Sequence, residues 1–183
     1  MDFRYYTRND SQVVVALVTS VFAEAESEVE GALVGKLTRD LVEKTDAHDL
    51  YGFVAVEEKQ VVDSQIIGSI LFSRLTFEDD LEAFILSPVA IHSDYQNQGI
   101  GQALIKHGLS ELKKKGVSVV MTYGNPAFYQ KVGFRSVSPK AIIPPYNLSR
   151  PQGWIGQCLS DDSIQELSGK CSCVEVLSNP KYW

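Results

Sequence analysis

The sequence predicts an α/β (α+β) protein with a mixed, mostly antiparallel and strongly twisted sheet of about seven strands and helices on both faces. Three observations support this. The 183 residues suffice for one domain with a sizeable core. Several β-rich runs follow one another at hairpin spacing. A single strand–helix–strand segment, 83–123, should place two parallel strands beside each other through a right-handed crossover.

The N-terminal part predicts one strand followed by two helices. Residues 3–6 are aromatic and indicate a first strand. After helix-start residues at 9–11, apolar side chains recur with a 3.6-residue period over 13–22. Ser27 and Glu30 then fit the capping box of a second helix.

The middle of the chain predicts three strands, a helix and a further buried strand. The strands are expected at 51–57, 66–77 and 83–91, and the last is apolar on both faces, which is typical of a central strand. Apolar residues then follow a helical period over 100–112. A short apolar run at 117–123 indicates the next buried strand.

The C-terminal part predicts short elements around a Pro-rich stretch. Expected are a short helix from 125–126, a strand from 133–134, an irregular stretch at 139–151, and strands at 154–159 and 171–176. We expect residues 1–138 to form a core and residues 139–183 to add strands that complete the same single domain.

Composition restricts the classes of partner and compartment. A net charge of −6 argues against a nucleic-acid partner and is compatible with a cationic substrate such as an amine. The chain shows no signal segment and no apolar run that could span a membrane, so a cytoplasmic location is expected. Three cysteines without framework spacing suggest reduced thiols, and the scattered histidines predict no metal.

Glycines mark a candidate anion site between the strand at 83–91 and the helix that follows. The pattern is Gln96-x-x-Gly99-x-Gly101. Glycine lets the backbone approach a pyrophosphate closely, and a helix N-terminus attracts negative charge. The alternative is that the glycines serve only a tight turn. A dinucleotide-binding fold is disfavoured, because its Gly-x-Gly-x-x-Gly turn at the first strand is missing.

Two further features accompany this loop. Tyr129-x-x-x-Gly133-Phe134 follows about 30 residues downstream. Pro88 lies within an otherwise central strand, where proline removes a ladder N–H and indicates a bulge or a splayed strand pair. A strand that simply ends earlier would also explain the proline.

Together the two motifs resemble the GNAT-family N-acetyltransferases, and in particular their branch of small bacterial predicted acetyltransferases. That family's signature is Gln/Arg-x-x-Gly-x-Gly/Ala, and many members carry Tyr-x-x-x-Gly-Phe downstream. The resemblance covers residues 83–135 in motif and 1–138 in layout. It implies a GNAT-type acyl-CoA N-acyltransferase fold and transfer of an acetyl group from acetyl-CoA to a primary amine by direct attack.

The resemblance also implies which residues bind the acyl donor. The main-chain N–H groups of Asn97 to Gln102 would hold the pyrophosphate, and a splayed strand at 89–91 would align the pantetheine and polarise the thioester carbonyl. The cofactor-binding candidates are Val89, Ala90, Ile91, Gln96, Asn97, Gln98, Gly99, Ile100, Gly101, Gln102 and Asn125. Many members place the asparagine seven residues before the tyrosine, whereas Asn125 lies four before Tyr129. A helix-cap role is the alternative for it.

Tyr129 is the first catalytic candidate, because in the family a tyrosine at this position is proposed to protonate the departing thiolate. Its alternative is an ordinary packed aromatic residue beside Phe128. The sequence identifies no general base, and Glu82 is the first carboxylate to test. Glu78, Asp79 and Asp80 are more typical of a solvated turn.

The sequence is compatible with more than one function. A non-catalytic acyl-CoA sensor could use the same fold, and a flavin or nicotinamide enzyme is a third reading that the glycine pattern disfavours. The acceptor is a small-molecule or peptide amine of undetermined identity. The tail Tyr182-Trp183 either packs on the sheet or contributes to a homodimer interface.

Overall fold

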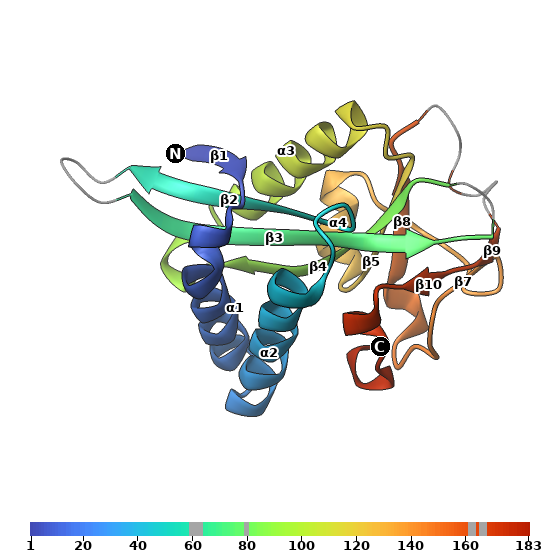
Figure 1. Cartoon of the computed structure of the whole chain (residues 1–183), viewed down its shortest axis with the longest axis horizontal. Helices are drawn as coiled ribbons and strands as arrows, with labels where there is room; N and C mark the ends of the chain where they lie inside the picture. The colour runs from blue at the N-terminus through green and yellow to red at the C-terminus, as the bar shows by residue number, and fades with distance from the viewer. Residues whose placement is uncertain (59–63, 79–80, 161–163, 165–167) are drawn as a thin grey trace. The chain divides into compact units, whose positions relative to one another are not determined.

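A computed structural model describes residues 1–58, 64–78, 81–160, 164 and 168–183 (Figure 1). The chain forms two compact units. The first unit comprises Met1–Leu71 and Pro88–Gly108, and the second comprises Phe72–Ser87 and Leu109–Trp183. Strands β3 (Ser64–Thr76) and β4 (Ala83–Ile91) contribute one part to each unit, as does helix α3 (Ile100–Lys114).

The first unit begins with a strand and two long helices, as predicted. Its own elements are β1 (Asp2–Tyr5), η1 (Arg8–Asp10), α1 (Ser11–Ala25), α2 (Glu28–Lys44), β2 (Leu50–Glu58) and η2 (Ser93–Tyr95). The strands follow the order β1-β2-β3-β4. Strands β1 and β2 are antiparallel, from Asp2↔Val56 to Tyr5↔Phe53.

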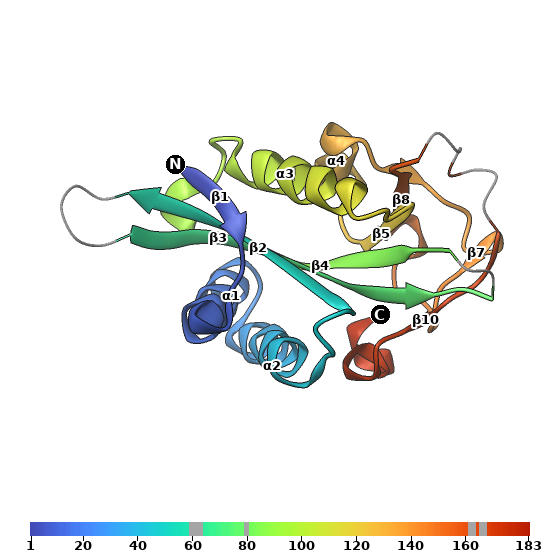
Figure 2. The ribbon, with the colours of Figure 1, turned by 45° about the horizontal axis from the view of Figure 1, so that its top comes forward.

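Helices cover both faces of the first unit's strands, with α1 and α2 on one face and the first part of α3 on the other (Figure 2). The alternation along β2 explains this arrangement, because successive side chains point to opposite faces. Val54 joins a buried apolar cluster with Val14 of α1. Its neighbour Phe53 instead meets His107 of α3 edge-on, with ring centroids 5.6 Å apart.

The two long helices pack closely because small residues line their contact. A Cβ atom at Gly35 of α2 would lie 2.0 Å from Thr19 Oγ1 of α1. The predicted N-cap of α2 is confirmed, since Ser27 Oγ accepts a hydrogen bond from the Glu30 amide at 3.2 Å. The apolar residues that recur over 13–22 are not all buried, because Val13 is 49% exposed.

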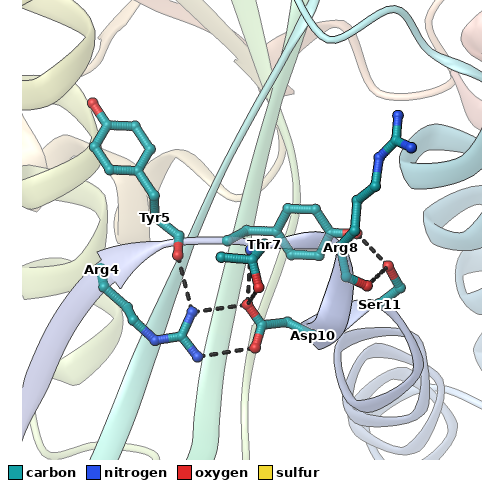
Figure 3. A network of polar contacts seen from close by, with 7 residues as sticks. Arg4, Tyr5, Thr7, Arg8, Asp10 and Ser11 are labelled. Carbon is teal, nitrogen blue, oxygen red and sulfur yellow. Dashed lines mark hydrogen bonds and ion pairs between the residues drawn. The ribbon is translucent and has the colours of Figure 1, made fainter.

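A carboxylate ties the start of α1 to β1 (Figure 3). Arg4 donates to both oxygens of Asp10, at 2.8 and 2.9 Å. The amide and the hydroxyl of Thr7 donate to the same carboxylate, at 2.7 and 2.9 Å. Charge-assisted donors favour the ionised acid. The pKa of Asp10 is therefore lowered to about 2, mainly by the hydrogen bonds from Arg4 and to a smaller extent by those from Thr7.

The second unit contains the remaining short elements. They are β5 (Val119–Tyr123), α4 (Pro126–Tyr129), η3 (Gln130–Val132), β6 (Arg135–Ser136), β7 (Ile142–Ile143), η4 (Pro151–Gly153), β8 (Trp154–Cys158), β9 (Gly169–Lys170), β10 (Ser172–Cys173), η6 (Glu175–Leu177) and η7 (Pro180–Tyr182). Its strands follow the order β3-β4-β5-β8-β6, with β10 paired to β3, and β7 and β9 form a separate parallel pair. The predicted parallel pair is confirmed, because β4 and β5 are parallel from Ala83↔Val119 to Leu86↔Thr122.

The mixed, mostly antiparallel sheet is confirmed, and in the described residues it has eight strands rather than about seven. The strand expected at 171–176 is shorter than predicted, because only β10 at 172–173 is a strand and η6 begins at Glu175. The short strand β9 precedes it, and the chain changes partner between the two at Cys171. Its thiol donates to the Ile143 carbonyl at 3.3 Å, whereas the next two residues pair with β3.

The C-terminal tail packs within the second unit. Trp183 is 6% exposed, and the centroids of the Trp183 and Trp154 rings lie 6.1 Å apart. Its indole N–H donates to the Leu177 carbonyl at 3.0 Å. The turn expected at Asp79 and Asp80 lies outside the described residues. Across the described residues, we find no helix that is both long enough and apolar enough to cross a membrane.

Candidate functional site

In the first unit, the loop between β4 and α3 has the backbone conformation of an anion cradle. After β4, the short helix η2 is followed by two residues with positive φ, Asn97 at 60° and Gly99 at 80°. Helix α3 begins immediately afterwards at Ile100. Left-handed residues next to a helix start turn consecutive N–H groups toward one side, where the helix dipole adds partial positive charge.

Gly99 is required for its conformation and not for space. An added Cβ atom there would meet nothing within 4 Å, whereas the φ of 80° is strained for other residues. The residues from Gln96 to Gly99 are all exposed. The main chain of this loop is therefore accessible to a ligand.

Side chains hold the loop in shape from within the same unit. Gln96 Nε2 donates to the Ile91 carbonyl at 2.9 Å, and Gln98 Nε2 donates to the Asp94 carbonyl at 3.0 Å. The Tyr95 hydroxyl donates to the carboxylate of Glu57 on β2. Two of the three glutamines predicted as cofactor-binding residues, Gln96 and Gln98, thus contact the loop's own backbone through their side chains.

The predicted thioester-aligning residues form the end of β4 in the first unit. Ala90 and Ile91 are buried, and Val89 is half-buried. The following amide, of His92, donates to the Ile67 carbonyl of β3 at 2.8 Å. This hydrogen bond to β3 therefore holds the chain just before the cradle.

The second unit holds Tyr129 at the end of α4, packed among aromatic rings. Its ring centroid lies 5.0 Å from that of Phe128 and 5.6 Å from that of Phe134. A Cβ atom at Gly124 would lie 2.7 Å from Tyr129 Cε2, so this glycine leaves room for the ring. At Gly133, φ is 101° and a Cβ atom would lie 2.8 Å from Gln157 Nε2. The glycine of the Tyr-x-x-x-Gly-Phe motif is therefore required both for its conformation and for space.

The hydroxyl of Tyr129 is kept protonated by its surroundings. Burial raises its pKa above the usual value, and a hydrogen bond with Thr122 partly opposes that shift. Thr122 lies on β5 and is 1% exposed. A phenol that stays neutral near pH 7 can donate a proton to a departing anion.

The other two candidates of the second unit have partners of their own. Glu82 forms an ion pair with Arg74 at 2.8 Å, and 54% of its side chain is exposed. Glu82 lies four residues before Leu86, the β4 residue that is paired with Thr122. Four residues correspond to roughly 13 Å along a strand. Asn125 caps α4, because its Oδ1 accepts a hydrogen bond from the Ala127 amide at 3.0 Å. The predicted cap role is confirmed, and a cofactor contact stays a prediction.

The predicted residues thus gather in two groups. Those at 89–91 and 96–102 lie together in the first unit, and Tyr129, Asn125 and Glu82 lie in the second. Sequence reasoning missed Thr122 and Gly124. A threonine inside an otherwise apolar strand was the available signal for Thr122. In the part of the chain that the structure describes, no group of three or more His, Cys, Asp or Glu could hold a metal ion.

The comparisons with known proteins identify the fold and the domain that carry both motifs. Residues 48–136 match the model of the acetyltransferase (GNAT) domain, a range that contains both motifs. The crystal structure of the GNAT-family N-acetyltransferase YhbS from Escherichia coli, in complex with CoA, superposes with a TM-score of 0.81. It is 26% identical, and the match covers 97% of this chain and 92% of that one. This chain therefore has the GNAT fold and contains a match to the GNAT domain.

Two other comparisons define how far the likeness extends. By sequence alone, the uncharacterised N-acetyltransferase YhbS of Escherichia coli K12 is 34% identical over 100 residues, which are 54% of this chain. The match spans about half, 56%, of that relative's length. A GNAT-family acetyltransferase from Brucella melitensis in complex with acetyl-CoA is 21% identical, with a TM-score of 0.71 and 96% of each chain covered. That similarity shows the GNAT fold alone.

Proposed function

We propose that this GNAT chain transfers an acetyl group from acetyl-CoA to a primary amine by direct attack. The observation that carries the proposal is the cradle, in which Asn97 and Gly99 adopt positive φ directly before α3. This arrangement suits a pyrophosphate without a basic side chain. The CoA in the YhbS structure supports the same class of ligand.

The residues would divide the reaction as follows. The N–H groups of residues 97–102 bind the pyrophosphate, and the β4 main chain at 89–91 orients the pantetheine and the thioester carbonyl. The amine attacks the carbonyl carbon, the C–S bond breaks, and the sulfur retains the electron pair. Tyr129 donates its proton to that sulfur, and the acceptor nitrogen loses one proton to water or to a base. Glu82, which is paired with Arg74 and 54% exposed, stays the first base to test.

Isothermal titration with acetyl-CoA tests the donor half of this proposal. We expect saturable binding with a dissociation constant below 1 mM, as roughly 4 kcal/mol or more of binding free energy requires. Absence of binding at millimolar acetyl-CoA would contradict it.

Thiol release with a panel of amines tests the acceptor half. Small amines, aminoglycoside-like compounds, peptide N-termini and lysine side chains should be included. We expect at least one class to release CoA in proportion to the acetylated amine. Tight binding without turnover on every class would instead support an acyl-CoA sensor.

A further inference from the structure

Tyr95 lies at the end of η2, just before Asn97, the first residue of the cradle with positive φ. Tyr95 is half-buried, whereas every other residue from Ser93 to Gly99 is exposed. Its amide donates to the His92 carbonyl at 2.8 Å, so the turn is closed by its own main chain. The Tyr95 side chain is therefore the part of this exposed segment that packs against the rest of the first unit.

The hydroxyl of Tyr95 attaches this segment to a strand that is distant in the sequence. It donates to the carboxylate of Glu57, a half-buried residue of β2 that lies 38 positions earlier in the chain. Side chains alternate along a strand, so Glu57 lies on the same face of β2 as Phe53, which meets His107 of α3. The hydrogen bond therefore joins the segment before α3 to the face of the sheet that α3 covers (Figure 2).

The side chains of Gln96 and Gln98 make more local contacts than Tyr95 does. They donate to carbonyls five and four residues away, so they hold the loop to itself and to the end of β4. The ring of Tyr95 meets the ring of His92 edge-on, with centroids 5.8 Å apart. Tyr95 therefore contacts the residue after β4 through its ring and β2 through its hydroxyl. A phenylalanine in its place would keep the first contact and lose only the second.

We propose that Tyr95 is a positioning residue that orders the cradle before acetyl-CoA binds, through its hydrogen bond to Glu57. This inference rests on the proposed binding of acetyl-CoA at residues 97–102. Ordering a loop costs conformational entropy, and a contact that already holds the loop removes part of that cost from the binding step. A hydrogen bond to an ionised acceptor is also stronger than one between neutral groups. Because Tyr95 acts on the conformation of the cradle, its hydroxyl should affect the affinity for the donor.

Calorimetry with acetyl-CoA tests the inference by measuring the effect of Tyr95→Phe in three backgrounds. In the wild type, loss of the hydroxyl should raise the dissociation constant about three- to tenfold. Glu57→Gln and Glu57→Ala remove the same charge, and only the glutamine keeps a carbonyl acceptor. The effect of Tyr95→Phe should therefore remain about twofold or more in Glu57→Gln and vanish in Glu57→Ala. Tyr6→Phe is the matched control, because the Tyr6 hydroxyl bonds to Ser11 within the same unit, and it should not change the affinity.

The outcomes separate this inference from the proposed function. An unchanged affinity in Tyr95→Phe would overturn the inference alone, because acetyl-CoA would still bind. An equal loss of affinity in the wild type and in Glu57→Ala would also overturn it, because the effect would not pass through this hydrogen bond. Absence of binding to the wild type would overturn the proposed function as well.

A second measurement needs no ligand. The amides of Tyr95 and Gln96 donate to main-chain carbonyls of the turn, so their exchange with solvent reports how well the turn is ordered. Measured by NMR in the free protein, this exchange should be about threefold faster or more in Tyr95→Phe and in Glu57→Ala than in the wild type. Tyr6→Phe should leave it unchanged. Equal exchange in the wild type and in Tyr95→Phe would overturn the inference, since the hydroxyl would then not order the turn.

Discussion

The two groups of candidate residues differ in how the chain makes them. In the first unit, the cradle consists of main-chain conformation, with exposed side chains around Asn97 and Gly99. In the second unit, Tyr129 is a side chain whose environment of aromatic rings and a buried threonine sets its chemistry. Substitutions in the cradle should therefore weaken binding of the donor, and substitutions around Tyr129 should slow the chemical step.

Of the substitutions considered, Tyr129→Phe should have the largest effect, a fall in kcat. Removing the phenolic proton donor should lower kcat by about 10²–10³, while the dissociation constant of acetyl-CoA changes less than twofold. Steady-state rates and calorimetry on the same preparation measure both. Tyr6→Phe is the control, because it removes a hydroxyl bonded to Ser11 in the first unit and should alter neither quantity. A large change in acetyl-CoA affinity for Tyr129→Phe would contradict the assignment of donor binding to the cradle and of the chemical step to Tyr129.

Gly124→Ala should give a smaller effect of the same kind. The new Cβ atom would lie 2.7 Å from Tyr129 Cε2, so the ring must shift between Phe128 and Phe134. Misplacing a catalytic group by a fraction of an ångström should lower kcat by about tenfold or more. Full activity in a variant whose Tyr129 ring has shifted would show that the position of the hydroxyl is unimportant.

In the cradle, Gly99→Ala should weaken acetyl-CoA binding about five- to tenfold and leave kcat within twofold. A left-handed φ costs a non-glycine residue roughly 1 kcal/mol, so the loop would relax away from its binding conformation. Gly116→Ala is a closely matched control, because Gly116 has a φ of 83° and also has nothing within 4 Å of an added Cβ atom. Calorimetry that found equal weakening in both variants would assign the effect to general destabilisation.

Asp10→Asn should lower the stability of the fold without altering kcat or the affinity for acetyl-CoA. The carboxyl pKa of Asp10 is lowered from 3.8 to about 2 in the folded protein, so its stabilisation is present above pH 4 and is lost as pH falls through 2. Because the partner Arg4 is 39% exposed, we expect a contribution of only about 1–2 kcal/mol at pH 7. Urea unfolding at pH 7 and between pH 4 and pH 2 measures it. A difference between wild type and variant that persisted unchanged at pH 2 would contradict this assignment.

The features with a strong local pattern were predictable from sequence. Strand 83–91 has the predicted bounds, and Ser27 is the predicted N-cap, because apolar runs and caps are local properties. The cradle was predictable because its glycines lie in a motif between a strand and a helix.

The features that depend on tertiary contacts were not predictable. Thr122 stands out in the sequence only as a threonine in an apolar strand, and its partner, the Leu86 carbonyl, becomes known only from the structure. Gly124 has no signal of its own in the sequence. Its role is to leave space for the ring of Tyr129, a contact that only the structure shows. The exposure of Val13 likewise depends on how α1 is rotated against its neighbours.

Amide hydrogen exchange with and without acetyl-CoA tests the central claim most directly. If the main chain of the cradle binds the donor and Tyr129 serves only the chemistry, acetyl-CoA should slow exchange at residues 97–102. The slowing should be equal in wild type and in Tyr129→Phe at equal saturation. Saturating binding by calorimetry with unchanged exchange at residues 97–102 would contradict the account.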